Sequence, residues 1–175
     1  SWLDIRAYPV GENLAVFYRD ITTRKHADIR RLALAELGDQ LCDLTDPDEI
    51  AFAAAEVLGK TLSIDRAGYG TIDKAAETIR VVRDWTAPGI QSLTGILHFR
   101  DYGSHIDDIK HGIVVVIADV ESDPRTEATA DILKSTGARA LVNMPITEQG
   151  GTVALLYLNN KTVREWSADE LEFIR

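Results

Sequence analysis

Two apolar runs near the end of the chain are joined by a short polar connection, and this spacing constrains the fold more than any other feature. The runs are 140–146 and 152–158, and the connection between them contains Gly150 and Gly151. A connection of this length closes a hairpin, whereas parallel neighbours need a crossover of roughly a dozen or more residues. A second pair of strand-like runs is separated by the polar residues 73–77. The sequence therefore predicts an antiparallel sheet.

Two helix-start signals lie on either side of these strands. Asp46 and Pro47 supply an acidic N-cap followed by proline at the first helical position, and Glu49 stands where a capping box places its acidic residue. Ser167 and Glu170 repeat the capping-box pattern close to the end of the chain. One helix is therefore predicted to follow residue 46 and another to follow residue 167.

The remaining segments complete an α+β pattern. Residues 104–110 and 127–135 are predicted to form short helices, the second closed by Gly137 at its C-terminal end. The continuous apolar run 113–118 is typical of a strand buried in the middle of a sheet. The predicted fold is a central antiparallel β-sheet flanked by helices.

The first residues have the pattern of a separate β-hairpin. Runs 2–9 and 14–18 are strand-like, and residues 11–13 supply the turn between them. Because an isolated two-stranded hairpin is marginal in water, these residues are expected to belong to the sheet of a truncated domain.

A helix is predicted to connect this hairpin to the rest of the chain. The joint 20–22 precedes it, and Thr22 or Thr23 is its expected N-cap. One face of the helix carries the evenly spaced residues Leu34, Leu37, Leu41 and Leu44. This run is short, so packing on the following domain and a dimer seam are both open alternatives.

The composition excludes several classes of protein. Hydrophobic residues make up 45% of the chain and charged residues 27%, which is typical of a globular domain. A net charge of -9 argues against broad contact with nucleic acid, and the basic residues within 24–31 have acidic neighbours and suit a solvated helix face. No stretch suits a membrane span or a leader peptide, so we expect a cytoplasmic segment without membrane contact. Cys42 is the single cysteine, which excludes an internal disulfide, and it is expected to be a small buried residue.

Residues 32–175 resemble a GAF domain. The resemblance rests on the order of elements, on residues 139–145, on the glycine turn with the following strand 153–158, and on a set of positions near the end of the chain. That set comprises Asn160, Lys161 and residues 166–170. The resemblance implies a GAF-like antiparallel sheet flanked by helices.

The residues upstream resemble the C-terminus of a PAS domain. The strand ending Phe17, Tyr18, Arg19 and the joint at residues 20–22 carry this resemblance. It implies a truncated PAS hairpin at 1–22, a connecting helix at 23–45 and a GAF domain at 32–175.

This arrangement is similar to the sensory region of bacterial PAS-GAF sensor histidine kinases. It implies a regulatory module of a two-component phosphorelay protein, which binds a small-molecule ligand and relays its state through flanking helices. A homodimer through the N-terminal and C-terminal helices is expected, with the output domain elsewhere in the same parent chain. No catalysis is expected in this segment. The alternatives are a ligand-free dimerisation and relay domain, and the input domain of a cyclic-dinucleotide enzyme.

The resemblance places a ligand pocket between the sheet and the long connecting segment 87–112. The polar and aromatic candidates to line it are Trp85, Tyr102, His105, Asp119, Arg139 and Asn143. Aromatic walls with few polar groups suit a small ligand. No catalytic residue is predicted, because no activated nucleophile or paired carboxylate is recognisable.

Metal and cyclic-nucleotide sites have simpler explanations. His98, His105 and His111 do not have the spacing of a metal site, so no metal is expected. A variant of the Asn-Lys-Phe-Asp-Glu motif of cyclic-nucleotide GAF domains is present as Asn160, Lys161, Trp166, Asp169 and Glu170. Helix capping and burial of the tryptophan account for these positions equally well.

No cofactor is expected. Bilin-binding GAF domains attach their chromophore to a cysteine after the central strand, and the corresponding residues 123–136 contain none. A covalent bilin is therefore disfavoured by the sequence.

Overall fold

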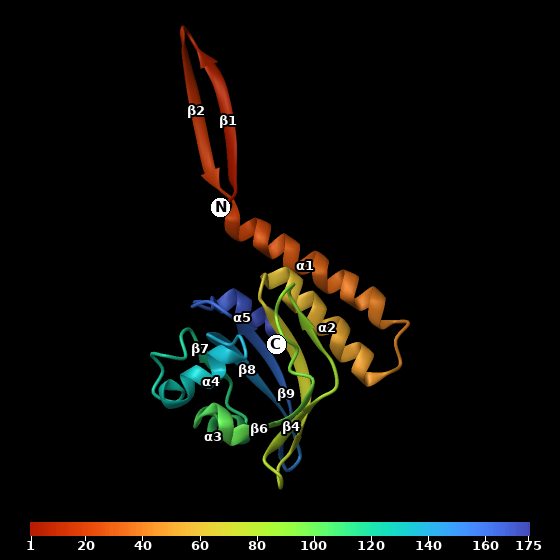
Figure 1. Cartoon of the computed structure of the whole chain (residues 1–175). Helices are drawn as coiled ribbons and strands as arrows, with labels where there is room; N and C mark the ends of the chain where they lie inside the picture. The colour runs from red at the N-terminus through yellow and green to blue at the C-terminus, as the bar shows by residue number, and fades with distance from the viewer.

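The computed structural model describes all residues 1–175, which form a projecting hairpin, a long helix and a body of sheet and helices (Figure 1). None of the helices combines the length and apolar character that crossing a membrane requires. The elements in chain order are β1 (Leu3–Val10), β2 (Asn13–Asp20), α1 (Thr22–Leu41), α2 (Pro47–Leu62), β3 (Arg66–Asp73), β4 (Thr78–Val81), β5 (Asp84–Thr86), β6 (Gly95–His98), η1 (Phe99–Tyr102), α3 (His105–Lys110), β7 (Val115–Ile117), η2 (Glu127–Thr129), α4 (Ala130–Ser135), β8 (Ala140–Glu148), β9 (Gly151–Asn160) and α5 (Ala168–Ile174).

Every strand pairing in the body is antiparallel, as the hairpin connections predict. The order across the sheet is β6-β4-β3-β9-β8-β7, and β5 pairs with the first part of β3. Gly150 and Gly151 close the longest hairpin with φ angles of 108° and 110°, a conformation that glycine adopts without strain. The predicted α+β class, with an antiparallel sheet flanked by helices, is confirmed.

The strand predicted within 113–118 lies at an edge of the sheet. β7 covers three residues and pairs with β8 alone. Val115 and Ile117 are buried in the core beneath α3 and α4, whereas Ile113 is 52% exposed. The predicted central position was wrong, because an edge strand with a well-covered face produces the same apolar run as a central strand.

The two faces of the sheet carry separate cores. α3 and α4 cover one face, and α2 and α5 cover the other (Figure 1). On β9, Leu155 and Tyr157 join the first core and Leu158 joins the second, since successive strand residues point to opposite faces. A polar residue of the sheet that points to the same side as Tyr157 therefore faces α3 and α4.

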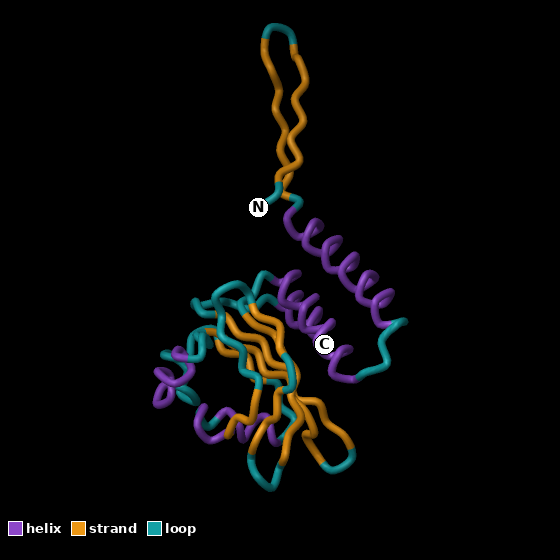
Figure 2. Tube along the Cα trace, turned by 45° about the vertical axis from the view of Figure 1, so that its right-hand side comes forward, coloured by secondary structure: helices purple, strands orange, loops and turns teal.

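The N-terminal hairpin projects away from the body, beyond α1 (Figure 2). Its register, with Ile5 opposite Tyr18, gives one face that is almost entirely apolar. Ile5 and Tyr18 are 62% and 77% exposed. The other apolar residues of this face are Leu3, Ala7, Pro9, Leu14 and Val16. The predicted hairpin is confirmed, and its apolar face is uncovered.

Three hydrogen bonds tie the hairpin to α1. The N–H of Ile21 donates to the carbonyl of Trp2 at 2.9 Å, and the N–H of Trp2 donates to Oγ1 of Thr22 at 2.7 Å. The N–H of Thr22 donates to Oδ1 of Asp20 at 2.8 Å, and hydrogen bonds from Thr22 hold the pKa of Asp20 below its usual range. Ile21 occupies the N-cap position without a side-chain cap. The predicted threonine cap is therefore absent, because the Thr22 hydroxyl accepts from Trp2.

α1 packs along α2 through part of its leucine face. Leu37, Leu41 and Leu44 are half-buried, whereas Leu34 is 52% exposed. Of the two alternatives for this helix, packing on the following domain is therefore observed within the chain. Cys42 is exposed at the C-terminal end of α1. Its predicted burial was wrong, because the leucine side of the last turn is the side that packs inward.

Replacing Asp46 with alanine is expected to lower the free energy of unfolding by about 1 kcal/mol. Oδ1 of Asp46 accepts from the N–H groups of Asp48 at 2.8 Å and Glu49 at 3.4 Å, which confirms the predicted start of α2. Urea denaturation measures the change. Asp43→Ala removes an exposed carboxylate that caps no helix and is the matched control. An equal loss in the control would contradict the capping role.

Candidate ligand-binding site

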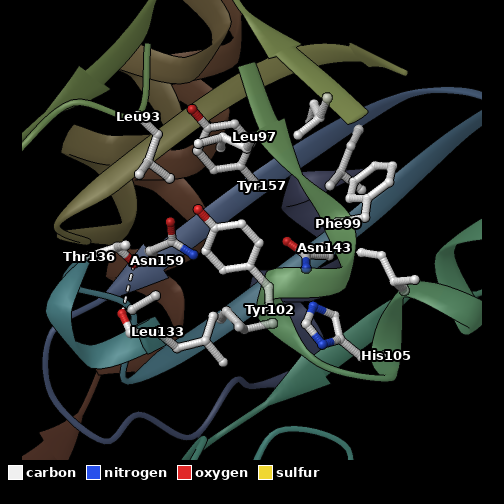
Figure 3. Close-up of a pocket in the computed structure, with 15 residues that line it drawn as sticks. Leu93, Leu97, Phe99, Tyr102, His105, Leu133, Thr136, Asn143, Tyr157 and Asn159 are labelled. Carbon is white, nitrogen blue, oxygen red and sulfur yellow. Dashed lines mark hydrogen bonds between the residues drawn. The ribbon is translucent and has the colours of Figure 1, made fainter. Parts of the chain in front are cut away.

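A cavity of about 70 Å³ lies between the sheet and the elements that cover its α3 and α4 face (Figure 3). β8 and β9 form one wall, and β4, β6, η1, α3 and α4 contribute the others. Eleven of the fifteen lining residues are hydrophobic, and the remaining four are His105, Thr136, Asn143 and Asn159. The cavity is therefore an apolar site with a few uncharged polar groups, the composition of a small-molecule site.

A sharp turn brings Tyr102 and His105 to the cavity. η1 ends at Tyr102, and Gly103 follows with a φ of 113°. A Cβ at Gly103 would lie 2.5 Å from the carbonyl oxygen of Arg125, so a larger residue does not fit there. His105 then begins α3. The connecting segment thus presents a phenol and an imidazole to the cavity.

The strands supply the polar groups on the opposite wall. Asn143 on β8 lies directly opposite Tyr157 on β9, and Asn159 follows two residues later on the same face. Asn143 is 8% exposed, and its side-chain amide takes part in no hydrogen bond within the chain. Figure 3 shows one imidazole nitrogen of His105 turned toward this amide. The amide is therefore unpaired within the chain and lies beside the imidazole in the cavity wall.

His105 is held uncharged by its surroundings. The residue is 2% exposed, and its Nδ1 is buried without a hydrogen-bond partner. Burial lowers the pKa of His105 to about 4, with a further contribution from the positive charge of Arg125. The nearby carboxylates Asp123 and Asp108 act in the opposite direction without reversing the shift. The imidazole is therefore neutral at pH 7 and carries one donor and one acceptor nitrogen.

A buried ion pair lies next to the cavity. Nε of Arg66 is 3.8 Å from Oδ2 of Asp84, and neither side chain is more than 1% exposed. Burial lowers the pKa of Arg66, although Asp84 acts against the shift. Asp84 also accepts from the hydroxyl of Tyr157 at 3.2 Å, and burial raises the pKa of that phenol. Both charges are thus matched inside the protein.

The same ion pair fixes the segments that enclose the cavity. Arg66 donates to Oδ1 of Asn159 at 3.1 Å and to the carbonyls of Gln91 and Thr136. Asp84 accepts from the N–H of Leu93 at 2.8 Å. The segment around 91–93 and the end of α4 are therefore both tied to the central strand β3.

Arg66 and Asp84 are absent from the residues predicted for the site, as are Tyr157 and Asn159. The available signal was a single arginine immediately before the strand-like run 67–72, which contains no charged residue and begins with Ala67 and Gly68. A charged residue in such a strand needs a buried partner.

The structure brings three of the six predicted site residues together. Tyr102, His105 and Asn143 line the cavity. Trp85 packs on the other side of the sheet, where its ring fills the space that a side chain at Gly59 would occupy. Asp119 and Arg139 form a partly exposed ion pair at 2.9 Å outside the cavity lining.

The histidines and the motif near the C-terminus lie in unrelated surroundings. No group of three His, Cys, Asp or Glu side chains is arranged to hold a metal ion. Nδ1 of His111 lies 2.6 Å from the carbonyl of Asp107, and His98 is exposed on β6. Ser167 and Glu170 form the predicted capping box, and Trp166 is buried in the core under α2 and α5. The capping interpretation of this motif is confirmed.

Solved structures with the same fold include chromophore-binding and enzymatic proteins. The phycoerythrobilin-bound GAF domain of a cyanobacterial phytochrome has a TM-score of 0.70 at 17% identity, covering 85% of this chain and 90% of its own. Free methionine-R-sulfoxide reductase from Neisseria meningitidis has a TM-score of 0.65 at 19% identity, covering 86% of each chain. The chromophore-binding domain of a bacteriophytochrome from R. palustris has a TM-score of 0.67 at 14% identity, covering 98% of this chain and 65% of its own. No curated protein matches the sequence.

The expectation of no cofactor, with a covalent bilin disfavoured, is contradicted by these structures. Cyanobacterial phytochrome domains of the same fold hold phycoerythrobilin or phycocyanobilin. The argument from residues 123–136 was wrong because it weighed a single attachment residue and not the scaffold, and the scaffold is what this chain shares with the bilin-bound domains.

The sequence itself identifies the family. Residues 46–175, about three quarters of the chain, match the family described as GAF domain. The matched region begins at the N-cap of α2 and contains the whole sheet of the body, with the cavity. The chain therefore belongs to the GAF domain family.

Proposed function

We propose that this chain is the sensory GAF module of a larger signal-transduction protein and binds a small molecule in the cavity beneath α3 and α4. The observation that carries the proposal is an apolar cavity whose wall holds two buried polar side chains, His105 and Asn143, that make no side-chain hydrogen bond within the chain. Leaving buried polar groups unpaired is costly, so a ligand that pairs with them gains affinity. Occupancy then biases the domain between conformations without turnover.

A bilin is one candidate ligand, since bilin-bound GAF domains share the fold. Cys42, the single cysteine, lies at the end of α1, which packs on α2 outside the cavity lining. Pockets for drug-sized ligands measure roughly 300–1,000 Å³, against about 70 Å³ here. A bilin does not fit the cavity as it stands, and the segment 87–112 would have to move away from the sheet to admit one.

The state of the cavity would reach other domains through α1 and α5. Arg30 on α1 donates to Oδ2 of Asp169 on α5 at 3.3 Å, which couples the two helices. In this proposal the hairpin and α1 end a PAS domain, whose remaining strands and helices cover the apolar hairpin face. The bacteriophytochrome domain supports this, because it matches 98% of the chain and so includes the hairpin and α1. The proposed parent is a homodimeric two-component sensor histidine kinase with its output domain in the same chain.

Native mass spectrometry of the purified chain, followed by an absorbance titration with biliverdin, tests the proposal. We expect one retained small molecule per chain, or a shifted biliverdin band. Tyr102→Ala should weaken retention about tenfold, the effect of losing about 1.4 kcal/mol of contact. Tyr8→Ala makes the same substitution on the exposed hairpin and is the matched control.

Two outcomes would count against a ligand in this cavity. Equal retention by Tyr102→Ala and the wild-type chain would move the binding site elsewhere. An empty spectrum together with an unchanged biliverdin band would favour the ligand-free relay domain, an alternative that the small volume of the cavity supports.

A further inference from the structure

We infer that the cavity selects small uncharged molecules that present a donor and an acceptor side by side, as a carboxamide does, and rejects the matching carboxylates. The inference rests on the proposed function, because it concerns the same cavity. It follows from two observations: the buried charges near the cavity are paired with each other, and two uncharged polar side chains in the cavity wall have no partner.

No lining side chain offers a charge to a ligand. The lining residues include no Asp, Glu, Lys or Arg. The nearest buried charges are Arg66 and Asp84, which face each other at 3.8 Å. The guanidinium of Arg66 also donates hydrogen bonds to Asn159, Gln91 and Thr136. A charged ligand would therefore leave water without gaining a partner, which is a large penalty in an apolar site.

The polar side-chain groups in the cavity wall that lack a hydrogen-bond partner are uncharged, and they include both donors and acceptors. The Asn143 amide supplies a carbonyl acceptor and an N–H donor, and the imidazole nitrogen of His105 that is turned toward it (Figure 3) supplies a donor or an acceptor, depending on the tautomer. Both residues are more than nine-tenths buried and line the same cavity. A carboxamide can donate to one of these groups while accepting from the other, whereas a carboxylate can only accept.

Protonated His105 could in principle pair with a carboxylate, and its surroundings oppose this. Its pKa of about 4, lowered first by burial and then by Arg125, leaves the imidazole almost entirely neutral at pH 7. Asp123 and Asp108, the carboxylates nearest to it, already pair with Arg125. Binding of a carboxylate would therefore have to provide the free energy needed to protonate the buried imidazole.

The volume limits the size of the ligand. An apolar cavity of roughly 150 Å³ accepts benzene, and the cavity here is about 70 Å³. Benzene has six non-hydrogen atoms, so a cavity of less than half the benzene volume holds about three or four, and an amide carrying a single methyl group suits this leucine-lined space. Acetamide and acetate are a matched pair of probes, because they have the same shape and differ in charge at pH 7.

Titration of the ¹⁵N-labelled chain with each probe, followed by NMR, tests the inference. We expect acetamide to bind at least ten times more tightly than acetate, with its largest shifts around Asn143 and His105. Asn143→Leu keeps the volume and removes the amide, so it should weaken acetamide binding and bring the two affinities closer. Asn13→Leu, on the exposed hairpin, should leave both affinities unchanged.

Equal or tighter binding of acetate would overturn the inference, as would the absence of binding by either probe. If Asn143→Leu does not fold, the ratio of the two affinities in the wild-type chain still decides the question. Native mass spectrometry and the biliverdin titration test the proposed function separately. A retained ligand without any amide preference would therefore remove this inference and leave the sensory role in place.

Discussion

Replacing Arg66 with methionine is expected to lower the free energy of unfolding by about 3 to 5 kcal/mol. The side chain is fully buried 3.8 Å from Asp84, which is itself 1% exposed. The substitution leaves that carboxylate in the interior without its counter-charge, and it also removes the hydrogen bond to Asn159. Methionine is long, flexible and apolar, so it fills most of the vacated space. The loss therefore measures charge pairing and hydrogen bonding more than an empty cavity.

Urea denaturation at pH 7 measures this loss, and a double-mutant cycle with Asp84→Asn isolates the pair. The double variant should be less destabilised than the sum of the single variants, because the second substitution removes the unpaired charge left by the first. Arg100→Met is the matched control, since Arg100 pairs with Glu77 on the surface and is 67% exposed. It should change stability little, because water screens an exposed pair. Additive effects of Arg66→Met and Asp84→Asn would contradict the paired role.

The same ion pair links stability to the candidate site. Arg66 ties the carbonyls of Gln91 and Thr136 to β3, and Asp84 ties the N–H of Leu93. These three groups belong to the segments that enclose the cavity. Loss of the pair is therefore expected to loosen the enclosure as well as the fold.

Local signals were enough to predict the framework of the fold. Asp46 and Pro47 define the start of α2, and Ser167 with Glu170 defines the start of α5, because capping depends on a few adjacent residues. The glycine turn determines the β8–β9 hairpin for the same reason. Each of these features needs no knowledge of distant parts of the chain.

The candidate site could be predicted only in part, because it depends on which face of a strand a residue occupies. Asp84 and Trp85 are neighbours on the short strand β5, and they point to opposite sides of the sheet. The aromatic residue was selected, but the aspartate is the one joined to the cavity wall through Tyr157. A strand of three residues has too little alternation to reveal its inward face.

The ion pair of Asp119 and Arg139 shows a second reason for the incomplete prediction. Asp119 follows β7 and Arg139 precedes β8, so pairing of these strands brings the two side chains together at the end of the sheet. Arg139 also bonds to Glu121 there. Sequence order suggested two separate polar groups for the pocket, whereas strand register makes them partners of each other.

Acidification from pH 7 to pH 5 is expected to destabilise the wild-type chain by about 2 kcal/mol through His105. Burial holds the folded-state pKa of this residue at about 4, below the ordinary histidine value of 6.5. The unfolded chain therefore takes up a proton in this pH range while the folded chain does not. The stability is fully present above the unfolded-state pKa and is lost as the pH falls from 6.5 toward 4. The positive charge of Arg125 adds to the downward shift of this pKa, and the carboxylates of Asp123 and Asp108 oppose it.

Urea denaturation of wild-type, His105→Gln and His98→Gln chains at several pH values between 7 and 5 tests this assignment. Glutamine has no titrating group, so His105→Gln should lose most of the pH dependence even if its stability at pH 7 is lower. His98 is exposed on β6, and His98→Gln should keep the wild-type slope. The pKa values of Glu77 and Asp119 are lowered by ion pairs, and their contributions are lost mainly below pH 5. A wild-type slope retained by His105→Gln would show that this imidazole is not held neutral, and it would remove the electrostatic basis for an uncharged cavity.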